Sequence, residues 1–394
     1  MKVLLIHNYV NPPSGENTVF DQETSLLRSN GVDVFTYTRH NQEIDNFGIK
    51  EKLRLPWGII WSHRTASDLE RIIDQYRPDV AHFHNIFPLI SPAAYYVCQR
   101  RGVPVVQTIH NFRLICLNAY CFRDGAICFD CRKSLFQGIF RACYRNSKVQ
   151  SAGVAVMLWL HGLWGTWTKM VTRYICLTPF QRDLFAQFGL PKQKLRIKPH
   201  FVQDPGSPSH NSKGDHALFI GRLGPEKGLE TLIRAWENLP PLGLYVIGEG
   251  PLKEYLGRMV STERVKFLGL VDNKTCMELL CASKFLVLPS ECYETMSMVI
   301  LEAMATGKPV LVSKLGSLPD LVIEGETGLL FKPGDSQDLT DKVQWLLEHE
   351  EEAEEIGRRA REEYEKKYTP EKNFDLLMKI YEEAISCTKN EKRF

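Results

Sequence analysis

The sequence predicts an α/β fold of two doubly wound, Rossmann-like parallel-sheet domains, and three observations support this. Short apolar runs alternate with helical stretches along the chain, and a Pro/Gly/Ser-rich stretch at 204–215 interrupts the alternation. The chain of 394 residues is also longer than a domain with a single hydrophobic core usually is. Alternating strands and helices form right-handed βαβ units and therefore parallel sheets. Ligands of such sheets bind beyond the carboxyl ends of the strands, so we expect a cleft between the two facing domains.

Five strands are expected in the first half of the chain. Each is a continuous apolar run bounded by polar residues or proline, which is typical of buried parallel strands. Between the first two runs, "NTVFDQETSLLRSNG" has helical spacing at Val19, Leu26 and Leu27 and a stop signal at Gly31. The five runs are 2–9, 33–39, 79–85, 104–110 and 174–179.

A second series of strands and helices follows the stretch 204–215. Its expected strands are 216–222, 244–250, 264–270, 284–290, 308–314 and 327–333. We therefore expect an N-terminal domain over 1–203, with a cysteine-rich insertion at 111–145, and a C-terminal domain over 204–368. Residues 369–394 are expected to form a helix that packs back on the N-terminal domain. The stretch "EHEEEAEEIGRRAREEYEKKY" predicts a solvated helix with alternating charges.

The composition is that of a soluble globular protein, with 44% hydrophobic and 24% charged residues. A formal net charge of +2 gives no reason to expect nucleic-acid binding. The apolar stretch at the start ends at Asn8 without a cleavage site, so no secretory signal is expected. Eleven cysteines without such a signal indicate a reducing compartment rather than a disulfide framework, and a cytoplasmic location.

A candidate anion site lies in "GRLGPEKGLETLIRAW", residues 221–236. Arg222 ends a strand, Lys227 precedes a helix, and the glycine-rich loop between them exposes backbone N–H groups. Two cations in such a loop can hold a diphosphate without a metal ion. The alternative is that both are solvated loop cations, because no complete Walker or Rossmann signature is present.

Two glutamates stand out in "PSECYETMSMVILEAMATGKPVLVS", residues 289–313. Glu294 lies on a predicted turn, whereas Glu302 lies in an apolar helical run beside Ile300 and Leu301. An unpaired charge in such a run is costly, so a polar partner is expected for Glu302. The two hydroxyls of a ribose would supply one, and the helix that starts near Ser297 would add N–H groups to a bound phosphate.

These motifs, with "GSLPDLVIEGETGLLFKPGD" (316–335), "KVLLIHNYVNPPSGE" and "QTIHNFRLICLNAYCFRDGAICFDC", resemble the family-4 glycosyltransferases of GT-B fold over nearly the whole chain. The resemblance implies catalytic roles for His110 and Glu294, which would both face the donor sugar. It implies a donor-binding set in which cations hold the diphosphate, Glu302 holds the ribose and a glycine lets the first loop approach: Gly15, Arg222, Lys227, Glu294, Ser297, Met298 and Glu302. Without the resemblance, a single histidine at a strand end such as His110 is more often a structural residue, and the alternative for Gly15 is a glycine that the turn requires.

The chain departs from the family pattern at three places. Ser14 precedes Gly15 where the family has paired glycines, Met296 and Ser297 replace a Phe and a Gly, and His200 replaces an Asn after proline. Each position touches sugar-binding backbone. The donor sugar and its base therefore stay open between UDP- and GDP-sugars.

The resemblance implies retaining transfer of a sugar, typically a hexose, from a nucleotide diphosphate to a glycan or lipid-linked hydroxyl, in surface polysaccharide or glycolipid synthesis. Charge that develops on the leaving phosphate would be stabilised by Arg222, Lys227 and the helix dipole, with front-face attack and without a catalytic metal. The alternatives are a nucleotide-sugar epimerase, a glycogen- or sucrose-type synthase, and a nucleotide-sugar-binding protein without transferase activity.

Five cysteines crowd into residues 116–143. Cys128 and Cys131 have the two-residue spacing that lets two thiolates meet one tetrahedral ion, and Cys116 and Cys143 would complete a structural zinc site. Cys121 is a substitute ligand in this interpretation. The alternative is a set of reduced, buried thiols.

Residues 149–168, "VQSAGVAVMLWLHGLWGTWT", contain no Lys, Arg, Asp or Glu but are flanked by cations. Apolar residues all round the helix favour a buried helix, whereas tryptophans and flanking cations suit a helix at a membrane surface. A spanning helix is disfavoured by the interrupting polar residues. A peripheral membrane location thus stands beside a purely soluble one.

Overall fold

The computed structural model describes residues 1–11, 14–206 and 214–391, so part of the stretch expected as a linker, 207–213, lies outside the described residues. The described chain divides into two compact units. The N-terminal unit comprises Met1–Tyr120, Phe129–Lys198 and the chain from Phe374 on. The C-terminal unit comprises Cys121–Cys128 and Pro199–Asn373.

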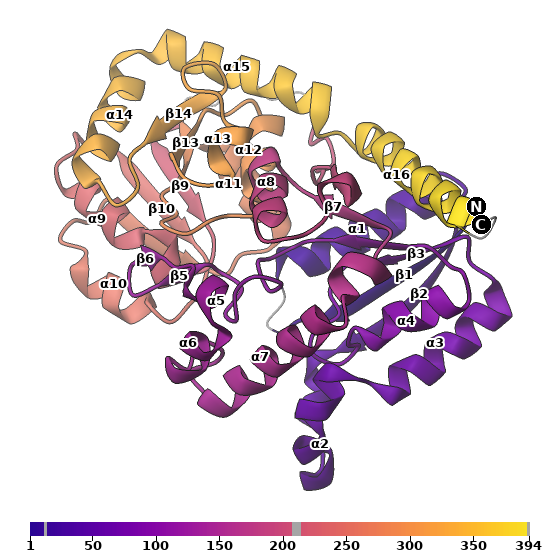
Figure 1. Ribbon diagram of the computed structural model, residues 1–394. Helices are drawn as coiled ribbons and strands as arrows, with labels where there is room; N and C mark the ends of the chain where they lie inside the picture. Colours follow the sequence, from indigo (N-terminus) through magenta and orange to yellow (C-terminus); the bar gives the residue numbers. More distant parts are fainter. Residues whose placement is uncertain (12–13, 207–213, 392–394) are drawn as a thin grey trace. The chain divides into compact units, whose positions relative to one another are not determined.

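The N-terminal unit is built on a six-stranded sheet in the order β2-β1-β3-β4-β7-β8, and all of its pairings are parallel (Figure 1). The strand order reverses at β1 and β3, as in doubly wound folds, which place ligand sites at that point. The strands are β1 (Lys2–Tyr9), β2 (Asp33–His40), β3 (Val80–Phe83), β4 (Val105–Thr108), β7 (Arg173–Cys176) and β8 (Leu195–Ile197).

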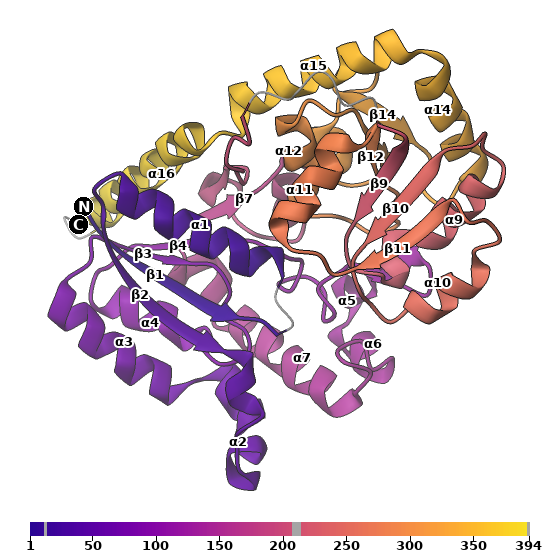
Figure 2. The ribbon, with the colours of Figure 1, turned by 180° about the vertical axis from the view of Figure 1, so that it is seen from behind.

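Helices cover both faces of this sheet. Figure 2 shows α1 (Gly15–Ser29) lying across one face, where Phe20 and Leu27 join a core with Leu377 and Tyr381 of α16 (Pro370–Glu391). The last helix therefore contributes core residues to the first unit of the chain. The remaining helices of this unit are α2 (Ile49–Ile60), α3 (His63–Tyr76), α4 (Ala93–Arg100), α5 (Asp130–Lys133), α6 (Leu135–Phe140), α7 (Lys148–Leu163) and α8 (Pro179–Gln187).

The C-terminal unit repeats this architecture with the order β11-β10-β9-β12-β13-β14, again all parallel. Its strands are β9 (His216–Ile220), β10 (Gly243–Ile247), β11 (Val265–Gly269), β12 (Phe285–Leu288), β13 (Val310–Ser313) and β14 (Gly328–Phe331). A short hairpin of β5 (Phe122–Arg123) and β6 (Ala126–Ile127) also belongs to this unit.

Helix α9 (Leu229–Glu237) packs with α14 (Ser336–Glu348), whereas α12 (Met298–Ala305) packs with α11 (Asn273–Ala282) and α15 (Glu350–Lys367) (Figure 2). Two shorter helices, α10 (Lys253–Met259) and α13 (Leu318–Leu321), complete the unit. The predicted fold class, two Rossmann-like parallel-sheet units, is confirmed.

Three local features differ from the expectation. Strand β8 is only three residues long, too short to give an apolar-run signal. Helix α15 is not solvated all round, because Ile356, Ala360 and Tyr364 are buried. Helix α7 buries Val154 and Leu158 but leaves other apolar side chains exposed, so its continuous apolar run combines a core face and a surface face. Across 1–11, 14–206 and 214–391, no helix combines the length and the apolar character that crossing a bilayer requires.

Candidate functional site

The loop after β9 holds the first group of predicted site residues. Arg222 directly follows the strand turn at Gly221, and its Nη2 donates to Glu226 Oε1 at 2.6 Å. Gly228 has a φ of +65°, and a Cβ added there would meet the carbonyl oxygen of Pro289 at 1.9 Å. Only glycine fits this close approach, so the loop is held against the end of β12 and α9 can begin at Leu229.

Lys227 and Glu294 form a direct pair within the C-terminal unit. Lys227 Nζ lies 2.6 Å from Glu294 Oε1, and the Ser290 hydroxyl donates to the same oxygen at 2.6 Å. Burial alone would raise the pKa of Glu294, but the Lys227 charge and the two hydrogen bonds hold that pKa below its usual value. Burial opposes the charge of Lys227, yet Glu294 raises the pKa of the ammonium group. Both groups are therefore charged at neutral pH.

Glu302 lies on α12, and burial raises the pKa of its carboxyl group. In the part of the chain that the structure describes, no hydrogen bond or ion pair reaches this carboxylate. The Cys276 thiol of α11 is an electrostatic neighbour of this carboxylate, but it carries no positive charge that could compensate the negative one. A half-buried carboxylate without a donor is costly, so Glu302 is suited to a ligand that brings hydroxyl donors.

The start of α12 completes this group. Ser297 is the N-cap residue and makes no side-chain cap hydrogen bond, and Met298 is the first helical residue. The first N–H groups of a helix have no partner within the helix and favour an anion. Just before them, Met296 Sδ accepts a hydrogen bond from the backbone N–H of His200 at 3.2 Å. The structure thus brings Arg222, Lys227, Glu294 and the α12 start to the carboxyl ends of β9 and β12.

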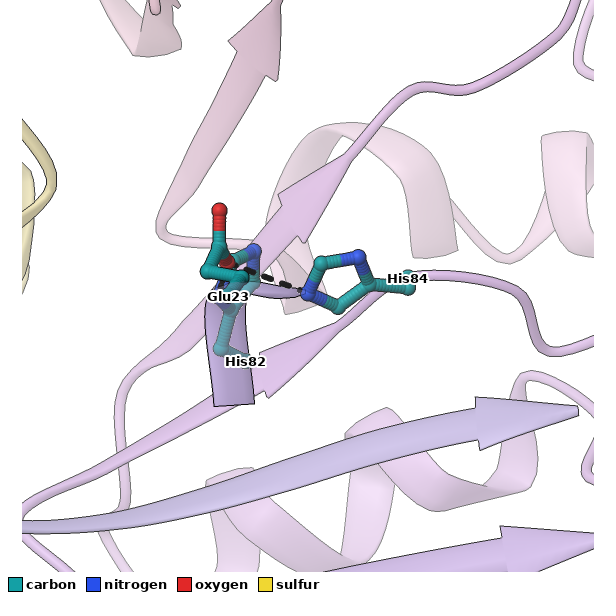
Figure 3. Close-up of side chains that lie close together, drawn as sticks. All are labelled: Glu23, His82 and His84. Carbon is teal, nitrogen blue, oxygen red and sulfur yellow. Dashed lines mark ion pairs between the residues drawn. The ribbon is translucent and has the colours of Figure 1, made fainter. Parts of the chain in front are cut away.

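His110 lies beyond the carboxyl end of β4 in the N-terminal unit, next to His84, which follows β3. His110 Nε2 lies 3.0 Å from His84 Nδ1, and the two rings stack with centroids 5.1 Å apart. His84 Nε2 in turn lies 3.2 Å from the carboxylate of Glu23 on α1 (Figure 3). The predicted site histidine therefore belongs to a larger buried cluster.

The sequence did not predict this cluster. Glu23 Oε1 also lies 3.2 Å from His82 Nδ1, and Glu23 Oε2 lies 2.7 Å from Lys198 Nζ. Burial would raise the pKa of Glu23, but Lys198 and His82 hold that pKa well below its usual value. One signal was available, because "DVAHFHN" places His82 and His84 two residues apart and thus on one face of a strand.

Gly15 and Glu16 begin α1. A Cβ added to Gly15 would meet nothing within 4 Å among the described residues. Burial raises the pKa of Glu16 to about 7, although Arg113 and hydrogen bonds from Asn111 and Asn85 oppose the shift. Glu16 is a titratable group that sequence reasoning missed, since an acidic residue in the first turn of a helix is unremarkable.

The predicted zinc ligands fall in both units. Cys116, Cys131 and Cys143 belong to the N-terminal unit, where a hydrogen bond with Cys116, burial and the nearby Cys143 raise the pKa of the Cys131 thiol. Cys128 directly follows β6 and belongs to the C-terminal unit, where its N–H donates to the Cys121 carbonyl at 2.8 Å. Three of the four thiols thus share one unit.

Helices α2, α6 and α7 of the N-terminal unit carry exposed apolar side chains, and α7 packs against both of the other helices (Figure 1). We call this set of side chains the apolar patch. Exposed cations flank it on the same helices and on their connections, including Lys50, Arg141, Arg145 and Lys148. Its members are Ile49, Trp57, Phe136, Phe140, Val149, Val156, Trp159, Leu163 and Trp164.

Comparisons with known proteins place this geometry in context. The family model "Glycosyltransferase Family 4" matches residues 13–204, and "Glycosyl transferases group 1" matches residues 203–363. A sulfoquinovosyl transferase of Arabidopsis thaliana is 27% identical over 372 residues, which are 90% of this chain and 68% of that protein.

Two solved structures share the fold. A sucrose-phosphate synthase from Thermosynechococcus elongatus has a TM-score of 0.73 at 18% identity, over 98% of this chain and 100% of that one. The Anabaena protein HepE, solved in complex with UDP, has a TM-score of 0.69 at 19% identity, over 96% of this chain and 99% of that one. HepE has also been solved with UDP-glucose.

Proposed function

Because the chain belongs to the family-4 glycosyltransferases of GT-B fold, we propose that it transfers a hexose from a nucleoside diphosphate sugar to a hydroxyl group with retention of anomeric configuration. The observation that carries this proposal is the half-buried Glu302 carboxylate, which meets no donor in the described protein. It lies in the same unit as a lysine–glutamate pair and a helix start. A ribose, a diphosphate and a sugar supply the hydroxyls and charges that these groups lack.

Each group has a defined role in donor binding. Glu302 accepts hydrogen bonds from the two ribose hydroxyls, since a carboxylate has two oxygens that can each accept from one donor. Arg222, Lys227 and the N–H groups at the start of α12, at Ser297 and Met298, meet the diphosphate. Glu294 accepts a hydroxyl of the donor sugar. Lys227 connects the diphosphate-binding groups with the sugar-binding Glu294, because its ammonium group is charged and contacts the Glu294 carboxylate.

The chemistry follows from this charge distribution. The bond between the anomeric carbon and the phosphate oxygen breaks, and negative charge develops on the leaving diphosphate. Arg222, Lys227 and the α12 dipole stabilise that charge, which is worth roughly 2.7–4 kcal/mol for one such group in comparable sites. The leaving phosphate takes the acceptor proton during front-face attack, so the reaction as proposed needs no catalytic metal. Gly15 and His110, which the family resemblance assigns to the donor sugar, belong to the N-terminal unit.

The acceptor is proposed to be lipid-linked, and the apolar patch supports this. Trp57, Phe140 and Trp159 are 72%, 72% and 56% exposed, and cations flank them. Exposed aromatic side chains with adjacent Lys and Arg suit the headgroup region of an anionic membrane, at about 1 kcal/mol per cation near the surface. The enzyme then works on a membrane surface, in glycolipid or surface polysaccharide synthesis.

Vesicle flotation tests the membrane contact. The full chain should float with vesicles that contain phosphatidylglycerol, fail to float with pure phosphatidylcholine, and detach as salt rises. Trp57→Ser plus Trp159→Ser should abolish flotation, whereas Tyr255→Ser, an exposed aromatic in the C-terminal unit, should not. If the chain floats with neither vesicle, the acceptor is instead a soluble glycan.

A structural zinc ion is proposed for the clustered thiols. Cys116, Cys131 and Cys143 lie in one unit, and a hydrogen bond with Cys116 raises the pKa of the Cys131 thiol. A zinc ion would replace the thiol protons and be held by these three thiolates. Protein purified without chelator should contain about one zinc per chain, and a metal-free protein with the same melting temperature would contradict this.

Transfer and hydrolysis assays with a panel of UDP- and GDP-sugars test the function itself. The donor that raises the melting temperature most, with UDP-glucose as the first probe, should also be turned over with retention. Binding without transfer or hydrolysis would indicate a nucleotide-sugar-binding protein. Conversion of the free sugar nucleotide to its epimer would indicate an epimerase.

A further inference from the structure

The buried cluster behind His110 combines the ligand types of a metal site, so that interpretation comes first. The ligand atoms of Glu23, His82 and His84 all lie within 4.8 Å of one another. Yet the ammonium group of Lys198 lies 2.7 Å from Glu23 Oε2, with both side chains 1% exposed. A cation therefore already occupies one carboxylate oxygen, and a divalent ion beside it would face strong repulsion.

His82 is also fully committed. Its Nδ1 lies 2.7 Å from the Tyr381 hydroxyl, and its Nε2 lies 2.8 Å from Thr108 Oγ1. A metal ligand needs one bare ring nitrogen that points at the ion. The cluster is therefore built to hold side chains in place rather than to bind an ion.

The path from this cluster to His110 runs through His84. In Figure 3 the His84 ring points at the Glu23 carboxylate, with Nε2 3.2 Å from Oε1. Among the described residues, no other atom is a hydrogen-bond partner of His84 Nε2, while Glu23 Oε1 also lies 3.2 Å from His82 Nδ1. The Glu23 carboxylate is thus the natural acceptor for a proton on His84 Nε2. The opposite nitrogen of His84, Nδ1, lies 3.0 Å from His110 Nε2.

Proton positions follow from these contacts. Glu23 is ionised, because Lys198 holds its pKa well below the usual value despite burial. Burial and the nearby His82 lower the pKa of His84 to about 4, so at neutral pH its ring carries one proton. That proton belongs on Nε2, which faces the anion. Nδ1 of His84 is then a bare acceptor and requires a donor. Among the described residues, the hydrogen-bond partner of this atom is His110 Nε2, which must therefore carry a proton.

We propose that Glu23, acting through His84, fixes His110 as the tautomer that carries its proton on Nε2 and presents Nδ1 as a hydrogen-bond acceptor. Glu23 and His84 are positioning residues. Nδ1 of His110 can then accept a hydrogen bond from a hydroxyl group of a sugar. In this tautomer Nδ1 cannot donate a hydrogen bond to a sugar oxygen. The contact between His110 and a sugar rests on the proposed glycosyltransferase function, whereas the tautomer of His110 does not.

Nitrogen NMR of the full chain labelled with 15N-histidine tests the tautomer directly. At pH 7 without substrate, long-range proton–nitrogen correlations of His110 should show a protonated Nε2 and a bare Nδ1. The signals are assigned by their loss in His110→Gln. A proton on Nδ1, a doubly protonated ring or a rapid mixture of tautomers would each overturn the proposal. The NMR spectrum does not depend on enzymatic activity, so it tests the tautomer even if the proposed function is wrong.

A double variant tests the cause. Glu23→Gln plus Lys198→Met removes both charges together, and the Gln amide can turn either its oxygen or its NH₂ group to His84. A second tautomer of His110 should become populated, and turnover should fall roughly tenfold or more, which is the scale known for partners that orient metal-bound histidines. The affinity for UDP should not change. Tyr381→Phe removes one hydroxyl from the same cluster and should leave tautomer and turnover unchanged. An unaltered His110 spectrum in the double variant would refute the role of Glu23.

Discussion

Each unit holds a lysine–glutamate pair at nearly the same distance, but the two pairs differ in exposure. Lys198 and Glu23 lie 2.7 Å apart and are each 1% exposed, whereas Lys227 and Glu294 lie 2.6 Å apart and are 20% and 13% exposed. In both pairs the lysine holds the pKa of the carboxyl group low against the effect of burial.

The surroundings explain the difference. Besides its lysine, Glu23 contacts two histidines, whereas Glu294 contacts one serine hydroxyl and is partly exposed to solvent. A fully enclosed pair cannot exchange its partners, so it serves to fix neighbouring groups. A partly open pair can exchange a protein partner for a ligand. We therefore propose that the same chemical pair positions neighbouring side chains in one unit and binds a ligand in the other.

The largest expected effect is on stability in the N-terminal unit. Lys198→Met leaves the Glu23 carboxylate enclosed without its cation, which typically costs about 3–5 kcal/mol of unfolding free energy. Urea unfolding should show this loss. The double variant Glu23→Gln plus Lys198→Met should recover most of it, because no buried charge remains. If the single and double variants were equally unstable, Lys198 would matter for packing and not for charge.

The open pair should respond in the opposite way. Lys227→Ala should cost only roughly 1–2 kcal/mol of stability, since solvent and Ser290 still reach Glu294. Turnover should fall about a hundredfold, as on loss of a group that stabilises the leaving charge. Arg222→Ala should behave similarly in steady-state kinetics. Should both variants lose less than threefold, the diphosphate assignment would be wrong.

A third carboxylate, that of Glu16, differs from both pairs because it should make the stability of the protein depend on pH. Glu16 has Arg113, Asn111 and Asn85 as neighbours, and burial raises its pKa from 4.5 to about 7. A raised pKa favours the protonated folded form, so its contribution is complete below about pH 4.5 and is lost as pH rises through about 7.

Glu16→Gln cannot ionise and lacks this dependence. The unfolding free energy of wild type relative to Glu16→Gln should therefore fall between pH 5 and pH 8 in urea titrations. The exposed Glu382→Gln serves as the matched control. A difference between wild type and Glu16→Gln that stays constant over this range would show that Glu16 titrates normally.

Particular residues show how far the sequence carried the fold and the site. Continuous apolar runs such as "FLVL" at β12 predicted the parallel sheets, because strands buried on both faces have this pattern. The three-residue β8 left no such signal. Glu302 was singled out because a charge in an apolar helical run is costly, and its carboxylate has no donor among the described residues.

The cluster behind His110 was beyond sequence reasoning for a physical reason. Glu23 and Lys198 are 175 positions apart and look like ordinary surface charges when read locally. Only the packing of α1 on the sheet, beside the end of β8, encloses them together. His82 and His84 gave a partial signal through their shared strand face, but their common partner was visible only in the fold.

Calorimetric titration of UDP into the full chain and into Glu302→Gln tests the central claim most directly. The variant keeps the size of the side chain and removes the charge that strengthens both ribose hydrogen bonds. We expect wild type to bind UDP and the variant to bind it roughly 10–100-fold more weakly, in line with hydrogen bonds to charged groups, at an unchanged melting temperature. Equal affinity in both proteins, or a wild type that binds neither UDP nor GDP, would contradict the account.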